Sequence, residues 1–173
     1  MASQDNWIHP SVTTRTTIMI AGADQHIRLD VTNALTASAA VFATFGAIRM
    51  VITDPAVPRA LVGSLRSLQD KGLTLTLPEK FVLSPERFIE DEYLVTVNWG
   101  RAPMCRTVPG GAYDPRYRRH VHWIDVEAGP LTFRFFDRAG HKAFVAELAR
   151  AGQAARSTLL PAHEKAQIIG TNT

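Results

Sequence analysis

The chain has 173 residues, of which 46% are hydrophobic and 20% are charged. This length suits a single domain with one core, and the composition excludes a chain that is disordered over most of its length. Nineteen Lys and Arg against sixteen Asp and Glu give a net charge of only +3, which excludes a protein that coats nucleic acid through its overall charge. A site for an anionic partner therefore requires local clustering of basic residues.

The single cysteine, Cys105, excludes an intramolecular disulfide and favours a cytoplasmic protein. Residues 31–48 are uncharged, but alanine, threonine and asparagine make them too weakly hydrophobic for a transmembrane helix. We therefore expect no contact with a membrane. Residues 1–160 are expected to form one globular α+β domain, and residues 161–173 a flexible C-terminal tail.

The first predicted elements are two strands, Thr13–Ile20 and His26–Val31, joined by turn residues into a hairpin. A helix over Thr32–Gly46 follows, because apolar residues recur there at a spacing of three to four. The small residues of this helix are Ala39, Ala40, Ala43 and Gly46. Such residues allow close packing against a second copy of the chain, so we expect a homo-oligomer, most simply a two-fold dimer.

Residues 48–77 form the next predicted unit, a strand, a helix and a second strand. Ile48–Ile52 is a short apolar strand, and Asp54 followed by proline is typical of a helix start. Gly72 ends the helix, and Leu73–Leu77 alternates as a strand does. This unit predicts one parallel crossover in a sheet that is otherwise mainly antiparallel.

The second half of the chain begins with a predicted strand at Tyr93–Trp99. The segment Gly100–Pro115 contains three prolines and three glycines, which predict a long loop with at most a brief strand. Arg116–Val126 and Leu131–Asp137 follow as a basic, aromatic β-hairpin, and a long amphipathic helix spans Arg138–Thr158. Together the elements predict an α+β fold with about three helices.

The basic hairpin dominates the local charge, since residues 101–142 contain eight Lys and Arg against four acidic residues. Arginine beside aromatic side chains suits phosphate contact combined with base stacking. We therefore expect a non-enzymatic binding or regulatory module whose partner is anionic, either nucleic acid or an acidic protein surface. The predicted contact residues are Arg116, Tyr117, Arg118, Arg119, Arg134, Arg138 and Lys142. The simpler interpretation is a solvated face whose arginines shield an edge strand.

His120 and His122 are two residues apart, so both face the same side of the predicted strand. A His-x-His pair of this kind can chelate a metal ion. No third ligand follows at a recognisable spacing, and exposed histidines without a metal are the simpler interpretation. The sequence therefore predicts neither a metal nor a cofactor.

Two other functions fit the sequence. One is a structural or assembly protein that self-associates through sheet edges and the alanine-rich helix predicted over Thr32–Gly46. The other is a small enzyme built around Gly100–Pro115, with Cys105, a histidine of the His-x-His pair and Asp54 as its reactive groups. A helix cap explains Asp54 and an ordinary apolar thiol explains Cys105. Since the chain has no recognisable catalytic motif, we predict no catalytic residue.

Overall fold

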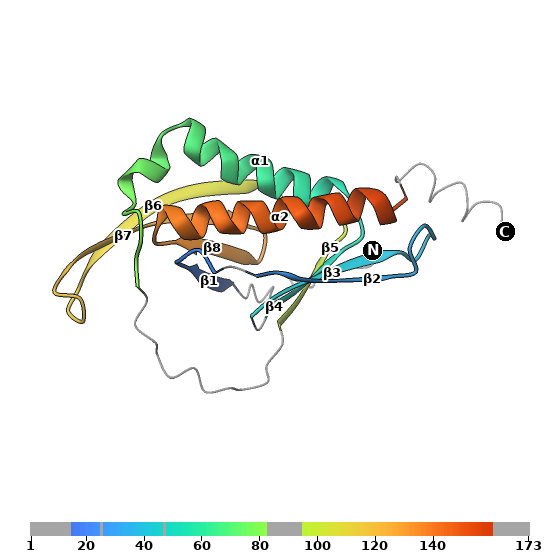
Figure 1. Cartoon of the computed structure of the whole chain (residues 1–173), viewed down its shortest axis with the longest axis horizontal. Helices are drawn as coiled ribbons and strands as arrows, with labels where there is room; N and C mark the ends of the chain where they lie inside the picture. Colours follow the sequence, from blue (N-terminus) through green and yellow to red (C-terminus); the bar gives the residue numbers. More distant parts are fainter. Residues whose placement is uncertain (1–14, 25, 47, 83–94, 161–173) are drawn as a thin grey trace, which may run out of the picture.

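The computed structural model describes residues 15–24, 26–46, 48–82 and 95–160. Within these residues, eight strands form two four-stranded sheets, and two α-helices lie side by side across them (Figure 1). Sheet A contains, in order, β1 (Thr16–Ile20), β8 (Leu131–Phe135), β7 (Arg119–Ala128) and β6 (Cys105–Asp114). Sheet B contains, in order, β2 (Arg28–Thr32), β3 (Ala40–Phe45), β4 (Ile48–Ile52) and β5 (Val95–Trp99). The helices are α1 (Ala56–Asp70), the short 3-10 helix η1 (Leu73–Thr76) and α2 (Arg138–Thr158).

The predicted α+β class is confirmed, and so are the two best-punctuated helices. The carboxylate of Asp54 accepts the backbone N–H of Ala56 at 2.7 Å, just where α1 begins. Asp137 is the N-cap residue of α2, and its Oδ1 accepts the N–H of Gly140 at 2.6 Å. Gly72 follows α1 with a φ of 69°, the left-handed conformation that commonly ends a helix.

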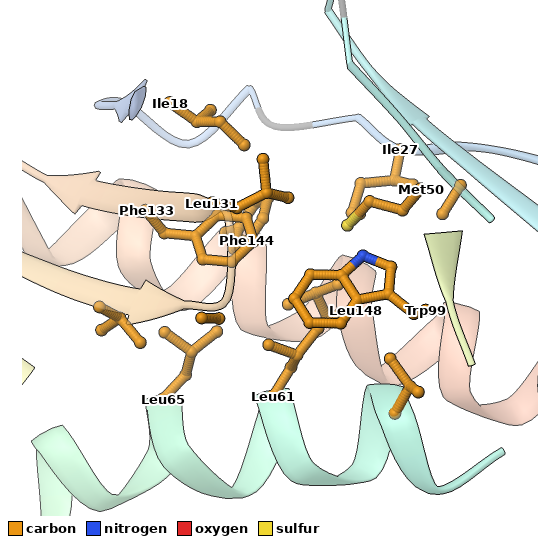
Figure 2. Packing of buried hydrophobic residues seen from close by; sticks show 14 of the residues in the cluster. Ile18, Ile27, Met50, Leu61, Leu65, Trp99, Leu131, Phe133, Phe144 and Leu148 are labelled. Carbon is orange, nitrogen blue, oxygen red and sulfur yellow. The ribbon is translucent and has the colours of Figure 1, made fainter. Parts of the chain in front are cut away.

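The hydrophobic core lies between the helices and the two sheets. Leu61 and Leu65 of α1 approach it from one side, and Phe144 and Leu148 of α2 lie beside them (Figure 2). Trp99 of β5 belongs to the same cluster and is only 5% exposed. One continuous apolar cluster therefore joins both sheets to both helices.

The helix predicted over Thr32–Gly46 is wrong. Turns occupy residues 33–38, and the residues that follow form β3, between β2 and β4 in sheet B. Ala39 and Ala43 are buried in the core, where β3 contacts α2. Here, packing between helix and sheet overrides the helical preference of alanine. These alanines are therefore not the exposed surface on which the predicted self-association was based.

Strand pairing differs from the prediction at two further places. β1 and β2 do not form a hairpin, because β1 pairs in parallel with β8 and β2 pairs antiparallel with β3. The predicted crossover does leave β4 through α1, but the strand that pairs in parallel with β4 is β5. Leu73–Leu77 is not a strand; it contains η1, in which Thr74 is buried and Leu75 is 71% exposed. Four of the six pairings among the described strands are antiparallel, as predicted.

The loop predicted over Gly100–Pro115 is also wrong, because most of it is β6. This strand pairs with β7 along its whole length of ten residues. It is the edge strand of sheet A, a position that tolerates proline because one side of the strand lacks a partner. Of the ten residues of β7, only Ile124–Ala128 pair with β8. The far half of the β6–β7 hairpin therefore extends past the sheet as an arm (Figure 1).

None of the helices in the described ranges has the length and apolar character that crossing a membrane requires. The uncharged residues 31–48 contribute to strands of sheet B instead of to a helix. The predicted C-terminal tail, residues 161–173, lies outside the described residues.

Candidate anion-binding hairpin

The arm ends in a turn formed by Pro115–Arg118, which connects β6 to β7. Arg116, Arg118 and Arg119 are all exposed there. Across residues 113–122, three arginines and one aspartate give a formal charge of +2. Arg118 has a φ of 50°, in the left-handed region, which lets the chain reverse within the turn. The end of the arm thus concentrates positive charge away from the core.

Local contacts hold the turn in this shape. Asp114 Oδ1 accepts the backbone N–H of Arg116 at 2.8 Å. The guanidinium of Arg119 lies 5.2 Å from the ring centre of Phe81 and 5.9 Å from that of Tyr117, within range of a cation–π contact. The two rings contact each other edge to face, with centres 5.1 Å apart. Arg119 is therefore positioned by a pair of aromatic side chains.

Phe81 connects the arm to the body of the protein. It packs with Val121 and Phe136 in a second apolar cluster, separate from the main core. The fully buried Asp137 fixes its backbone, since Asp137 Oδ2 accepts the N–H of Phe81 at 2.7 Å and that of Gly22 at 2.9 Å. Sequence reasoning missed the role of Phe81, because it lies in an irregular segment where no periodicity points to a partner.

Two glycines of β6 allow rings on β7 to lie across the arm. Gly110 pairs with Trp123, and Gly111 pairs with His122. A Cβ atom at Gly110 would lie 2.4 Å from Trp123 Nε1, and one at Gly111 would lie 2.9 Å from His122 Nδ1. Because neighbouring residues of a strand face opposite sides, each face of the arm has one glycine covered by a ring. Pro109-Gly110-Gly111, part of the segment predicted as a loop, is therefore a site of cross-strand packing.

Arg134, another predicted contact residue, is held within sheet A. Its Nε and Nη2 atoms donate to the two carboxylate oxygens of Asp125, both at 2.8 Å. The guanidinium also lies 4.5 Å from the ring centre of Trp123. Hydrogen bonding to Asp125 raises the pKa of Arg134, and this effect outweighs the opposing effect of burial.

Arg138 and Lys142 lie on the first turns of α2 instead of on the hairpin. Arg138 Nη2 is 2.9 Å from a carboxylate oxygen of Glu79, and Lys142 is exposed. The seven predicted residues therefore divide into two groups. Four gather at the end of the arm, and three lie on β8 and α2.

The two histidines of the His-x-His pair share one face of β7, as predicted, and both are exposed. The ring of His120 contacts that of Tyr113 edge to face, with centres 5.7 Å apart. In the described parts of the chain, no three His, Cys, Asp or Glu side chains form a group that could hold a metal ion. The pair therefore offers imidazole donors beside the arginines of the turn.

Cys105 lies far from both histidines of the enzyme hypothesis. Cys105 begins β6, whereas His120 pairs with Tyr113, eight residues further along that strand. At about 3.4 Å per residue, this separation is roughly 27 Å. His122 is also distant, because its partner Gly111 is six residues from Cys105. Neither histidine is therefore placed to activate the thiol.

A hollow of about 820 Å³ lies beside the start of β6, lined by residues 98–104 and Gly129. Arg101 is the charged side chain of this lining, which otherwise consists of apolar, glycine and asparagine residues. The described residues of the lining thus include no acid, imidazole or thiol for acid–base or nucleophilic chemistry. Comparison with protein-family models, curated proteins and solved structures finds no match to this chain.

Proposed function

We propose that this protein is a non-enzymatic binding module that contacts nucleic acid through the end of its β6–β7 arm. One observation carries the proposal. The turn at the end of the arm, beyond the part of β7 that pairs with β8, exposes Arg116, Arg118 and Arg119 together. Guanidinium groups form two-point hydrogen bonds with phosphate oxygens, and each phosphate contact releases counterions from the nucleic acid.

The shape of the arm favours nucleic acid over an acidic protein surface. A two-stranded β-ribbon fits the major groove of B-DNA, which is about 12 Å wide. Tyr113, 57% exposed, and His120 add rings beside the arginines, and such rings can stack on unpaired bases. The proposal gives phosphate contact to the turn, whereas Arg134 and Arg138 hold Asp125 and Glu79.

The proposal includes two further points. One is a cytoplasmic location, because a chain with a single cysteine suits a reducing compartment. The other is self-association, which β6 supports because one side of this ten-residue edge strand has no neighbouring strand among the described residues. A two-fold dimer would present two arms. Light scattering at micromolar concentration tests this point, and a mass of 19.1 kDa would contradict it.

The test of function is fluorescence anisotropy with labelled duplex DNA and single-stranded RNA over a range of salt concentrations. Arg116→Gln/Arg118→Gln removes two charges at the turn and leaves the packing of Arg119 in place. Each lost phosphate contact should reduce the slope of log K against log salt by about 0.7–0.9, so the expected total is roughly 1.4–1.8.

The matched control is Arg28→Gln/Arg101→Gln, which removes two exposed charges away from the arm. The control should retain the affinity and salt dependence of the wild type. Absence of saturable binding of wild-type protein to either nucleic acid at low salt would refute the proposal. Equal losses in the arm variant and the control would show that overall charge, and not the arm, is responsible.

A further inference from the structure

The layer of helices carries more positive charge than the chain as a whole. α1 and α2 together contain six basic and two acidic residues, a formal charge of +4 against +3 for all 173 residues. Two of the basic residues are neutralised nearby, since Arg150 pairs with Glu147 and Arg138 pairs with Glu79. The remaining four are separate from the β6–β7 arm and need their own explanation.

Three of these residues line a groove of about 320 Å³ between the helices. Arg59 and Arg66 come from α1, and Arg156 comes from α2 beside Gln153. Among the described residues, no carboxylate lines the groove, and none of the three arginines forms an ion pair. All three arginines are exposed, so water and salt screen their mutual repulsion, and an anion between them would remove it.

Small residues keep this groove open. Gly63 lies on α1 between the two arginines, and a Cβ atom added there would meet nothing within 4 Å. Alanine is more favourable than glycine inside a helix, so packing within the chain gives no reason for a glycine at this position. Close approach of a ligand to the helix backbone gives one. Gly152 lines the facing side, on α2.

The spacing of the charges indicates the kind of anion. Arg59 and Arg66 are seven residues apart on one helix face, roughly 10 Å along the axis. The helices run antiparallel, because Gly152 lies next to Pro58 and His141 contacts the carbonyl of Leu65. Arg156 therefore lies toward the end of the groove marked by Arg59. An extended anion with charge at several points matches this arrangement better than one compact ion.

We propose that the groove between α1 and α2 binds an oligophosphate, a ligand with two or more linked phosphate groups. Arg59, Arg66 and Arg156 contact the phosphate oxygens, Gln153 donates from its amide, and Gly63 leaves room for the chain of phosphates. The shared chemistry is that of inorganic oligophosphate and of the phosphate tail of a nucleotide. This site is independent of nucleic-acid binding by the arm.

Isothermal titration of the full chain with sodium tripolyphosphate tests the proposal, with sodium sulfate at equal ionic strength as the single-anion comparison. Tripolyphosphate should bind saturably and sulfate should not. Arg59→Gln/Arg66→Gln should raise the Kd about tenfold or more, as expected for lost charge-assisted hydrogen bonds. A parallel titration with ATP distinguishes the sources: tighter binding than tripolyphosphate assigns a nucleotide, and equal or weaker binding assigns inorganic oligophosphate.

Gly63→Leu is a second variant that does not depend on removing charge. Leucine favours helix and has open space at this position, so the Tm should not fall, whereas the filled groove should lose tripolyphosphate binding. Arg28→Gln/Arg101→Gln, which removes two exposed charges away from both the groove and the arm, is the matched control and should bind tripolyphosphate like the wild type. Failure of the arm to bind DNA would leave these expectations unchanged, so the two proposals fail separately.

Three results would overturn the oligophosphate site. The first is the absence of saturable binding of tripolyphosphate to the wild type. The second is equal binding of sulfate, and the third is unchanged binding in both Arg59→Gln/Arg66→Gln and Gly63→Leu. If wild-type protein ignores tripolyphosphate but Arg59→Gln/Arg66→Gln loses DNA binding, the groove belongs to the nucleic-acid surface instead.

Discussion

Asp125 and Arg134 face each other on β7 and β8 and share two hydrogen bonds of 2.8 Å. Their side chains are 14% and 30% exposed, so the pair is partly shielded from water. A two-point contact with this shielding stabilises a protein more than an open surface ion pair does. Since Arg134 also covers Trp123, we expect it to stabilise sheet A.

A double-mutant cycle measures this contribution. Arg134→Gln, Asp125→Asn and the combined variant should give a coupling of roughly 1–2 kcal/mol in the free energy of unfolding by urea. Binding of nucleic acid, corrected for stability, should change little in Arg134→Gln. If the two substitutions are additive within about 0.3–0.5 kcal/mol, the pair does not stabilise the sheet.

Asp137→Asn should destabilise the protein by about 3 kcal/mol. The buried carboxylate accepts N–H groups from Gly22, Phe81 and Gly140, and an asparagine amide would direct its own donors at some of them. Chemical denaturation measures the change. Asp54→Asn is the matched control. The side chain of Asp54 accepts the backbone N–H of Ala56, and asparagine caps helices about as well as aspartate. An equal loss in both variants would contradict the role assigned to Asp137.

Gly110→Ala should lower the free energy of unfolding by about 1–3 kcal/mol. The new methyl group would lie 2.4 Å from Trp123 Nε1, so the indole must move away from β6, which disturbs its contact with Arg134. Urea denaturation and the wavelength of tryptophan emission report this change. Gly100→Ala is the control, since its Cβ atom would meet nothing within 4 Å. Similar stability of both variants would show that Trp123 moves at no cost.

Stability should fall as the pH falls below about 6.5, in part because of His141. Burial lowers the pKa of His141, and the hydrogen bond from its Nε2 to the carbonyl of Leu65 only partly opposes this. Between the lowered folded value and the unfolded value of about 6.5, the unfolded chain binds more protons, so acid favours unfolding. Above that window the contribution of His141 is complete.

The free energy of unfolding of His141→Gln should therefore depend less on pH than that of the wild type. Urea denaturation at about pH 5.5, 6.5 and 7.5 measures this. Glutamine keeps a donor for Leu65 and does not titrate in this range. His120→Gln, at the exposed end of the arm, should retain the full dependence of the wild type. Equal pH dependence in the wild type and His141→Gln would contradict the assignment.

Local chemistry makes parts of this fold readable from the sequence. Asp54, Gly72 and Asp137 act within one turn of the helix that each begins or ends, so their effect does not depend on distant residues. The β7–β8 hairpin is readable for the same reason. The register of this hairpin could not be read from the sequence. In the structure the turn contains only Gly129 and Pro130, and Ala128 lies opposite Leu131. A longer turn was predicted, which hid the pairing of Asp125 with Arg134.

Other parts depend on contacts between distant segments. Ala43 favours a helix locally, but it lies in a strand because α2 packs on β3. Gly110 and Gly111 suggest a loop until the rings that cover them are known. For the candidate site, the exposed arginines of the turn could be predicted, whereas Phe81 beneath Arg119 could not. Arg59 and Arg66 of the groove could have been predicted to share a surface. They are seven residues apart on α1, on the side opposite its buried stripe, and this spacing was not used.

The parallel pairing of β1 with β8 has a consequence for synthesis on the ribosome. Thr16 lies opposite Leu131 and Ile20 opposite Phe135, so 115 residues separate each pair. β1 therefore leaves the ribosome long before its partner exists, while β2, β3 and β4 can pair with immediate neighbours. β1, the first of the described strands to be synthesised, can pair only after β8 has emerged. Until then its backbone N–H and C=O groups must form hydrogen bonds with water or with a chaperone.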